Sequence, residues 1–145
     1  MTILVTGLDS AGKTTFCRKL VNRLFCSYFN ADDVRRQTKN NDFSMNGRKL
    51  AAENIKHAVD CSAQEVKIVD SICPTPELRQ IIQPDVIVFI DSKLPPKYPD
   101  TTNIYTPPSE KECQKLFVAK FNRHAETIEN LVFWIQENLP KNWNV

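Results

Sequence analysis

The chain has 145 residues, 41% hydrophobic and 25% charged, with a formal net charge of +2. These proportions are ordinary for a globular protein, and the near-balanced charge excludes a general pull toward nucleic acid or membrane surfaces. The five cysteines are odd in number and lack C-x-x-C spacing, which favours reduced thiols in the cytoplasm over a disulfide framework or zinc site. No apolar run approaches membrane-spanning length, so we expect neither a signal peptide nor a transmembrane helix.

Apolar runs and helical periodicity alternate along the chain. Strands are predicted at 2–6, 27–31, 65–71 and 85–91, with a weaker one at 115–121. Helices are predicted at 13–25, at 47–64, shortly after Pro76, and at 123–139. This alternation predicts an α/β fold with a doubly wound, mainly parallel five-stranded sheet. Residues 1–145 then form one domain, in which the proline-rich segment 92–109 is a long lid-like or substrate loop.

The stretch GLDSAGKTT between the first strand and the first helix reads G-x-x-x-x-G-K-T, the phosphate-binding P-loop. Its glycines allow a tight turn and a close approach of backbone N–H groups to phosphate, and the helix N-terminus adds partial positive charge. Lys13 is predicted to bind the β/γ-phosphates of ATP, and the Thr14 hydroxyl to bind Mg²⁺. The alternative is a strand-to-helix turn without a ligand. The predicted nucleotide-binding residues are Gly7, Leu8, Asp9, Ser10, Ala11, Gly12, Lys13, Thr14 and Thr15.

The stretch FNADDVRRQ follows the second predicted strand and places two acids and two arginines at the carboxyl edge of the sheet. Asp32 there can accept the proton of an attacking hydroxyl or bind Mg²⁺ through water, and Arg35 can hold a substrate phosphate. On a short helix, Asp32 and Arg35 share a face while Asp33 points away. In the alternative interpretation, Asp32 caps the helix and pairs with Arg35 and Arg36.

Two later strand ends also carry acids. Asp70, after the third strand, is either a second acidic partner for Mg²⁺ or a structural residue, and the sequence does not separate the two. Asp91, after the fourth strand, is interpreted as a turn acceptor.

The polar stretch NNDFSMNGRK contains a single aromatic residue, Phe43, and ends close to the predicted second helix. An exposed phenylalanine can stack on a base, and Arg48 can reach a phosphate or sulfate. Alternatively, Phe43 covers the core and Arg48 is solvated.

The segments GLDSAGKTT, FNADDVR, NDFSMNGR, IVDSICPTPELR and VIVFIDS, in this order and spacing, resemble adenylylsulfate kinase, a P-loop kinase family. The resemblance covers about residues 2–109. It implies that Asp32 acts on the acceptor hydroxyl and that Arg35 binds substrate. It further implies an acceptor pocket containing Phe43, Ser44, Arg48, Ile72, Cys73 and Pro74.

The chain departs from this family at three places. The stretch NADD lacks one acid of the family's Asp-Gly-Asp-Asn. The family's asparagine and arginine pair fall on Ala51, Glu53 and Asn54, which removes two positive charges. The basic lid of the family is reduced to Lys93 and Lys97.

Together these features predict an ATP- and Mg²⁺-dependent phosphotransferase acting on an alcohol group, with the 3′-OH of adenylyl sulfate as the favoured acceptor. A polynucleotide or modified-nucleoside hydroxyl kinase is the first alternative, although the net charge of +2 does not favour nucleic acid. A nucleotide-binding regulator without catalysis is the second. The expected partner is a small-molecule nucleotide and no membrane, and a homodimer is left open.

Overall fold

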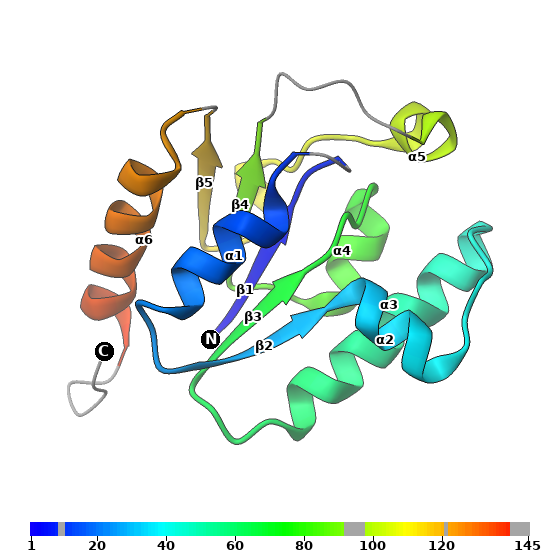
Figure 1. The fold of residues 1–145 in the computed structure, drawn as a ribbon, viewed down its shortest axis with the longest axis horizontal. Helices are drawn as coiled ribbons and strands as arrows, with labels where there is room; N and C mark the ends of the chain where they lie inside the picture. The colour runs from blue at the N-terminus through cyan, green and yellow to red at the C-terminus, as the bar shows by residue number, and fades with distance from the viewer. Residues whose placement is uncertain (9–10, 92–97, 121, 140–145) are drawn as a thin grey trace.

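The computed structural model describes residues 1–8, 11–91, 98–120 and 122–139. Within them, five parallel strands form a sheet in the order β2-β3-β1-β4-β5 (Figure 1). The central strand β1 is buried at every position, which its aliphatic and β-branched residues permit. The strands are β1 Thr2–Thr6, β2 Cys26–Asn30, β3 Val66–Asp70, β4 Val86–Ile90 and β5 Lys115–Ala119.

Helices cover both faces of this sheet. Residues of α1 and α6 pack in one apolar cluster with the sheet, and residues of α3 and α4 pack in a second, as the layers in Figure 1 show. None of the described helices is long and apolar enough to cross a bilayer. The helical elements are α1 Lys13–Val21, α2 Ala31–Thr38, α3 Met45–Cys61, α4 Pro76–Ile82, α5 Pro99–Ile104, the 3-10 turn Glu110–Glu112 and α6 His124–Asn138.

The predicted α/β fold with a doubly wound, five-stranded sheet is confirmed, and every strand pair is parallel. The interpretation of 92–109 as one long loop is wrong for its described part, because α5 lies within it. Pro99 at the first helical position and Asp100 in the first turn both favour a helix start. Residues 92–97, including Lys93 and Lys97, lie outside the described residues.

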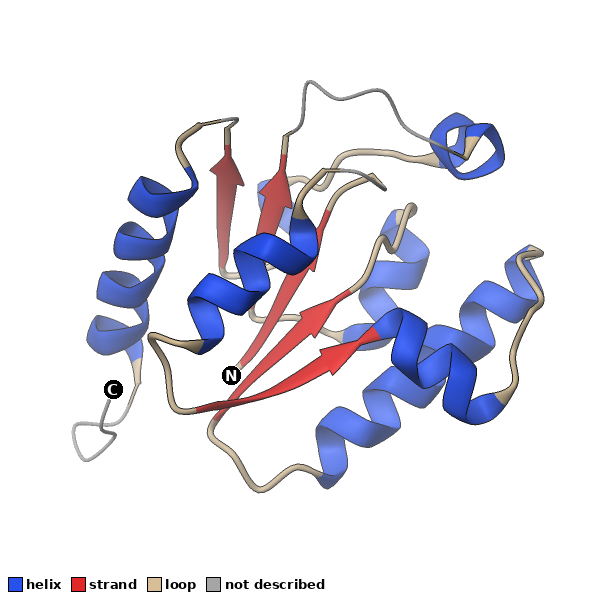
Figure 2. Cartoon of the chain, viewed as in Figure 1, coloured by secondary structure: helices blue, strands red, loops and turns tan. Residues whose placement is uncertain are grey.

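Because all strands are parallel, their carboxyl ends meet at one edge of the sheet, toward which the arrowheads in Figure 2 point. The register pairs Asn30 at the end of β2 with Asp70 at the end of β3. Val5, next to the end of β1, pairs with the same Asp70 from the other side. Side chains from three neighbouring strand ends are thereby brought together.

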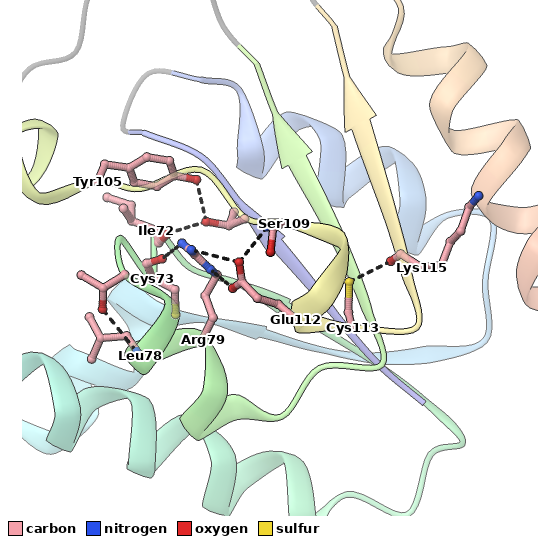
Figure 3. Close-up of polar contacts among 11 residues, drawn as sticks. Ile72, Cys73, Leu78, Arg79, Tyr105, Ser109, Glu112, Cys113 and Lys115 are labelled. Atoms are coloured by element: carbon pink, nitrogen blue, oxygen red, sulfur yellow. Dashed lines mark hydrogen bonds and ion pairs between the residues drawn. The ribbon is translucent and has the colours of Figure 1, made fainter.

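The loop that follows β3 is held by hydrogen bonds to the backbone carbonyls of Ile72 and Cys73 (Figure 3). The Thr6 hydroxyl donates a hydrogen bond to the carbonyl of Ile72 and lies 3.0 Å from the Tyr105 hydroxyl. The Arg79 guanidinium donates to the carbonyl of Cys73 at 2.9 Å. Cys73 has a φ of 39°, a left-handed conformation that costs free energy in a residue with a side chain. The surrounding hydrogen bonds therefore hold a strained loop.

Arg79 of α4 is one of the most buried side chains, at 1% exposure, and its charge is paired with Glu112. Arg79 Nε donates to Glu112 Oε1 at 2.7 Å (Figure 3). Glu112 also accepts a hydrogen bond from the backbone N–H of Ser109 at 2.7 Å. One ion pair thus connects α4, the loop after β3 and the segment that precedes β5.

We predict that Arg79→Met lowers the free energy of unfolding by about 3–5 kcal/mol, because it leaves the Glu112 carboxylate without its buried partner. The double variant Arg79→Met/Glu112→Gln should recover part of this loss, since it removes the uncompensated charge. Urea unfolding followed by circular dichroism measures both. As a matched control, Arg23→Met breaks an exposed pair with Glu129 and should leave the midpoint nearly unchanged. Equal effects of Arg79→Met and Arg23→Met would contradict the prediction.

Candidate active site

The P-loop connects β1 to α1 through two glycines with left-handed or otherwise restricted conformations. Gly7 has a φ of 156°, and a Cβ there would lie 2.8 Å from the carbonyl oxygen of Ile90. Gly12 has a φ of 88° and precedes α1 without any side-chain cap. Because glycine has no side chain, Gly12 cannot itself cap α1, and an anion can bind at a helix N-terminus of this kind.

The remaining P-loop residues divide between the core and the cavity beside the loop. Ala11 is buried and its N–H donates to the carbonyl of Leu8 at 3.1 Å, so both belong to the turn. The ammonium of Lys13 donates to the same Leu8 carbonyl at 3.1 Å. Asp9 and Ser10 lie outside the described residues. Gly12, Lys13, Thr14 and Thr15 line the cavity.

Asp70 is the acid that connects the P-loop to the neighbouring strands. Its Oδ2 accepts hydrogen bonds from Thr14 Oγ1 at 3.0 Å, from the Tyr28 hydroxyl at 2.7 Å and from Asn30 Nδ2 at 3.2 Å. Asp70 is 3% exposed, so this oxygen obtains its partners from the protein. From the sequence, Asp70 was equally compatible with a role beside Mg²⁺ and with a structural role. Tyr28 was not identified at all.

The arrangement of Thr14 and Asp70 fits a divalent cation bound with a nucleotide. Oxygen donors are the ligands that Mg²⁺ prefers. A threonine hydroxyl that donates its proton to a carboxylate keeps its lone pairs for a cation. A buried carboxylate beside a phosphate-binding helix terminus supplies the negative charge that such an ion requires. Thr14 would bind the ion directly, and Asp70 would hold Thr14 and the ion's water.

Asp32 and Asp33, at the start of α2, lie in different surroundings. Asn30 caps the helix, accepting from the N–H groups of Asp32 at 2.9 Å and Asp33 at 3.2 Å. The alternative in which Asp32 is the cap is therefore wrong, because the side-chain oxygen of Asn30 takes the capping position. Asp33 forms an ion pair with Arg36 on the exposed side, whereas Asp32 lines the cavity.

Two arginines lie close to the ring of Phe43, and all three residues line the cavity. The guanidinium carbon of Arg35 lies 4.2 Å from the ring centroid, and that of Arg48 lies 5.8 Å from it. Burial, and then repulsion by Arg48, lower the pKa of Arg35. Phe43 as a whole is 61% exposed. An exposed aromatic residue beside two cations can bind a flat molecule that carries negative charge.

The same arginines also hold protein backbone. Arg35 donates to the carbonyl of Asp42 at 3.0 Å, and Arg48 donates to that of Phe43 at 2.8 Å. Arg48 further donates to the Thr101 hydroxyl in α5 at 3.1 Å. They thus fix the loop before α3 and connect it to α5.

Ser44, predicted to contact substrate, is instead the N-cap of α3 and accepts from the N–H of Gly47 at 3.4 Å. It does not line the cavity. Asp91 follows β4 as an exposed residue and is also absent from the cavity wall.

These residues surround one cavity of about 740 Å³ at the carboxyl edge of the sheet. Its described wall contains three cations, Lys13, Arg35 and Arg48, and three carboxylates, Asp32, Asp70 and Asp100. The backbone wall predicted at Ile72, Cys73 and Pro74 is present, and α3 contributes an apolar wall of Ala51, Ala52 and Ile55. The cavity is large enough for a ligand of ordinary size. Tyr98, Asp100 and Thr101 also line it; they belong to the segment predicted as a lid-like or substrate loop, in which no single residue was named.

Comparison with protein-family models and with curated protein sequences finds no match. Solved structures do match the fold. The APS kinase CysC of Mycobacterium tuberculosis, in complex with AMPPNP and APS, has a TM-score of 0.65 at 18% identity, covering 92% of this chain and 96% of that one. Chaetomium thermophilum Kti12, in complex with ADP-AlF3, has a TM-score of 0.66 at 17% identity, covering 92% and 98%.

Shikimate kinase from Aquifex aeolicus matches with a TM-score of 0.63 at 17% identity, covering 95% of this chain and 98% of that one. These neighbours include kinases named for different acceptors, so the shared architecture does not select one of them. The chain has the fold of the P-loop kinases.

Proposed function

We propose that this protein transfers the γ-phosphoryl group of ATP to a hydroxyl group, with adenylyl sulfate as the favoured acceptor. The observation that carries the proposal is the meeting, in one cavity, of the P-loop residues Lys13 and Thr14 with two carboxylates, Asp70 and Asp32. Phosphoryl transfer needs a cradle for the phosphates, a cation site and a group that orients the acceptor. In this proposal Lys13 belongs to the cradle, Thr14 and Asp70 form the cation site, and Asp32 orients the acceptor.

The P-loop binds the anion through the N–H groups of α1 and through Lys13, whose ammonium moves from the Leu8 carbonyl to the phosphates. Thr14 and Asp70 would hold Mg²⁺, which when bound would neutralise charge on the β- and γ-phosphates. Asp32, with its backbone N–H fixed by Asn30, accepts the proton of the acceptor hydroxyl. The tightly held wall at Ile72 and Cys73 keeps the acceptor in line.

Phe43 with Arg35 and Arg48 beside it favours an acceptor with a planar base and an anionic group, which adenylyl sulfate provides. Beyond Arg48, the residues of α3 that line the cavity are the apolar Ala51, Ala52 and Ile55. Within the described part of the chain, negative charge on the acceptor would therefore be met by Arg35 and Arg48. A polynucleotide hydroxyl kinase and a regulator that binds ATP without catalysis are the competing functions.

The free thiols favour the cytoplasm as the location of the protein.

The test is a γ-labelled ATP assay with adenylyl sulfate, oligonucleotides and nucleosides as acceptors, run in parallel. We expect label on adenylyl sulfate and a strict dependence on Mg²⁺. A polynucleotide acceptor would instead give activity that falls steeply as salt increases, because phosphate contacts release counterions. Tight ATP binding without transfer to any acceptor would contradict the enzymatic proposal and favour the regulator.

Lys13→Ala should lower the rate of transfer by about 10²-fold or more, because such catalysis depends on positioning and charge. Steady-state kinetics with the best acceptor measures the effect. Lys19→Ala, an exposed lysine later in α1, serves as the control and should retain the rate. Near-normal turnover of Lys13→Ala would show that the lysine does not hold the transferred group.

Asp32→Asn should lower kcat by about 10²- to 10⁴-fold with ATP affinity little changed, because proton removal from the acceptor is lost. Asp33→Asn is the matched control, since Asp33 pairs with Arg36 outside the cavity, and should cost far less. Kinetics at saturating ATP compares the two. If the two variants behave alike, or if Asp33→Asn is the more damaging, Asp32 is not the acceptor's base.

A further inference from the structure

Tyr28 is a residue of the edge strand β2 whose hydroxyl reaches across the strand ends to Asp70. Its bond to Asp70 Oδ2, at 2.7 Å, is shorter than those from Thr14 at 3.0 Å and Asn30 at 3.2 Å. Tyr28 belongs neither to the P-loop nor to any segment predicted to bind the acceptor. Tyr28 is 38% exposed as a residue, and its hydroxyl is held by a polar partner, Asp70.

The three donors all approach the same oxygen of Asp70. An ionised carboxylate has about four acceptor sites over its two oxygens, so Oδ2 is fully used. Among the described residues, no hydrogen bond reaches Oδ1. The donors on Oδ2 therefore fix the plane of the carboxylate and leave Oδ1 as the oxygen that can accept from water bound to a cation.

Tyr28 is suited to this role because its hydroxyl is held from two sides. It donates to Asp70 Oδ2 at 2.7 Å and accepts from Asn30 Nδ2 at 3.3 Å. The phenol is a rigid donor, whereas the Thr14 hydroxyl must also serve the cation.

We propose that Tyr28 is a positioning residue for the divalent cation: it holds Asp70 Oδ2 so that Thr14 and Oδ1 face the ion in a fixed geometry. This inference rests on the proposed function, because the cation is the one that would accompany ATP. Partners of this kind, one shell out from a metal, typically change metal affinity by about 10- to 100-fold when removed.

The test measures Mn²⁺ binding to the full chain in the presence of AMPPNP, by electron paramagnetic resonance of free Mn²⁺. Mn²⁺ has the same preference for oxygen ligands as Mg²⁺. Tyr28→Phe keeps the ring and removes only the hydroxyl, and we expect Mn²⁺ affinity about 10-fold weaker. AMPPNP affinity in EDTA should be unchanged. Tyr105→Phe is the matched control: it removes a hydroxyl bonded to Thr6 rather than Asp70, and Mn²⁺ affinity should be retained.

Each outcome has one meaning. If Tyr28→Phe binds Mn²⁺ as the unaltered chain does, the inference fails and the proposed function is untouched. If Tyr28→Phe also loses AMPPNP affinity in EDTA, or if Tyr105→Phe weakens Mn²⁺ binding equally, Tyr28 has only a general structural role and the inference again fails. If the unaltered chain binds no Mn²⁺ in the presence of AMPPNP, both the inference about Tyr28 and the proposed function fail.

Discussion

The carboxylate of Asp70 is the constraint around which the site is organised. It lies where two strands and the first helix meet, and it is too buried to be solvated by water. A buried carboxylate is costly unless donors surround it. The three donors of Asp70 come from α1 and β2, so satisfying this one charge fixes the P-loop helix relative to the edge of the sheet.

The charge balance of the cavity has a second consequence. Three cations face three carboxylates, so the described wall carries no large net charge, even though phosphate groups would bind there. Lys13 lies at the P-loop, whereas Arg35 and Arg48 lie together at the far side around Phe43. Two separate positive regions, with Asp32 and Asp70 on the same wall, suit two anionic groups that must be brought together for transfer. A uniformly basic cleft would bind such groups without distinguishing them.

The two sides of the acceptor region differ in how firmly they are held. The loop after β3 is fixed by Thr6, by Arg79 and by a bond from the N–H of Thr106 to the carbonyl of Pro74 at 2.7 Å. Among the described residues, α5 on the opposite side is joined to α3 by a hydrogen bond from Arg48 to Thr101.

The sequence alone determined the fold class, the P-loop and the positions of the strands to within a residue or two, because these depend on local pattern. A buried parallel strand must be apolar, and a phosphate-binding turn must contain glycine at defined positions, so both are visible in GLDSAGKTT and its flanks. Phe43, Arg48 and Asp32, which line the cavity, were also named from their places at predicted strand ends and helix starts.

Only the tertiary structure decided which polar groups meet. Tyr28, Asn30 and Thr14 converge on Asp70 because β2 and β3 pair in one register, and strand pairing between distant segments has no local signature. The same reason explains why the pairing of Arg79 with Glu112, 33 positions away, was not predicted. The Ser44 cap is a local contact with the N–H of Gly47, and the sequence analysis assigned that serine to the substrate instead. Helix α5 was missed because prolines indicate a loop as readily as a helix start. Local chemistry can be predicted from neighbouring residues, whereas a site made by long-range contacts exists only once the chain has folded.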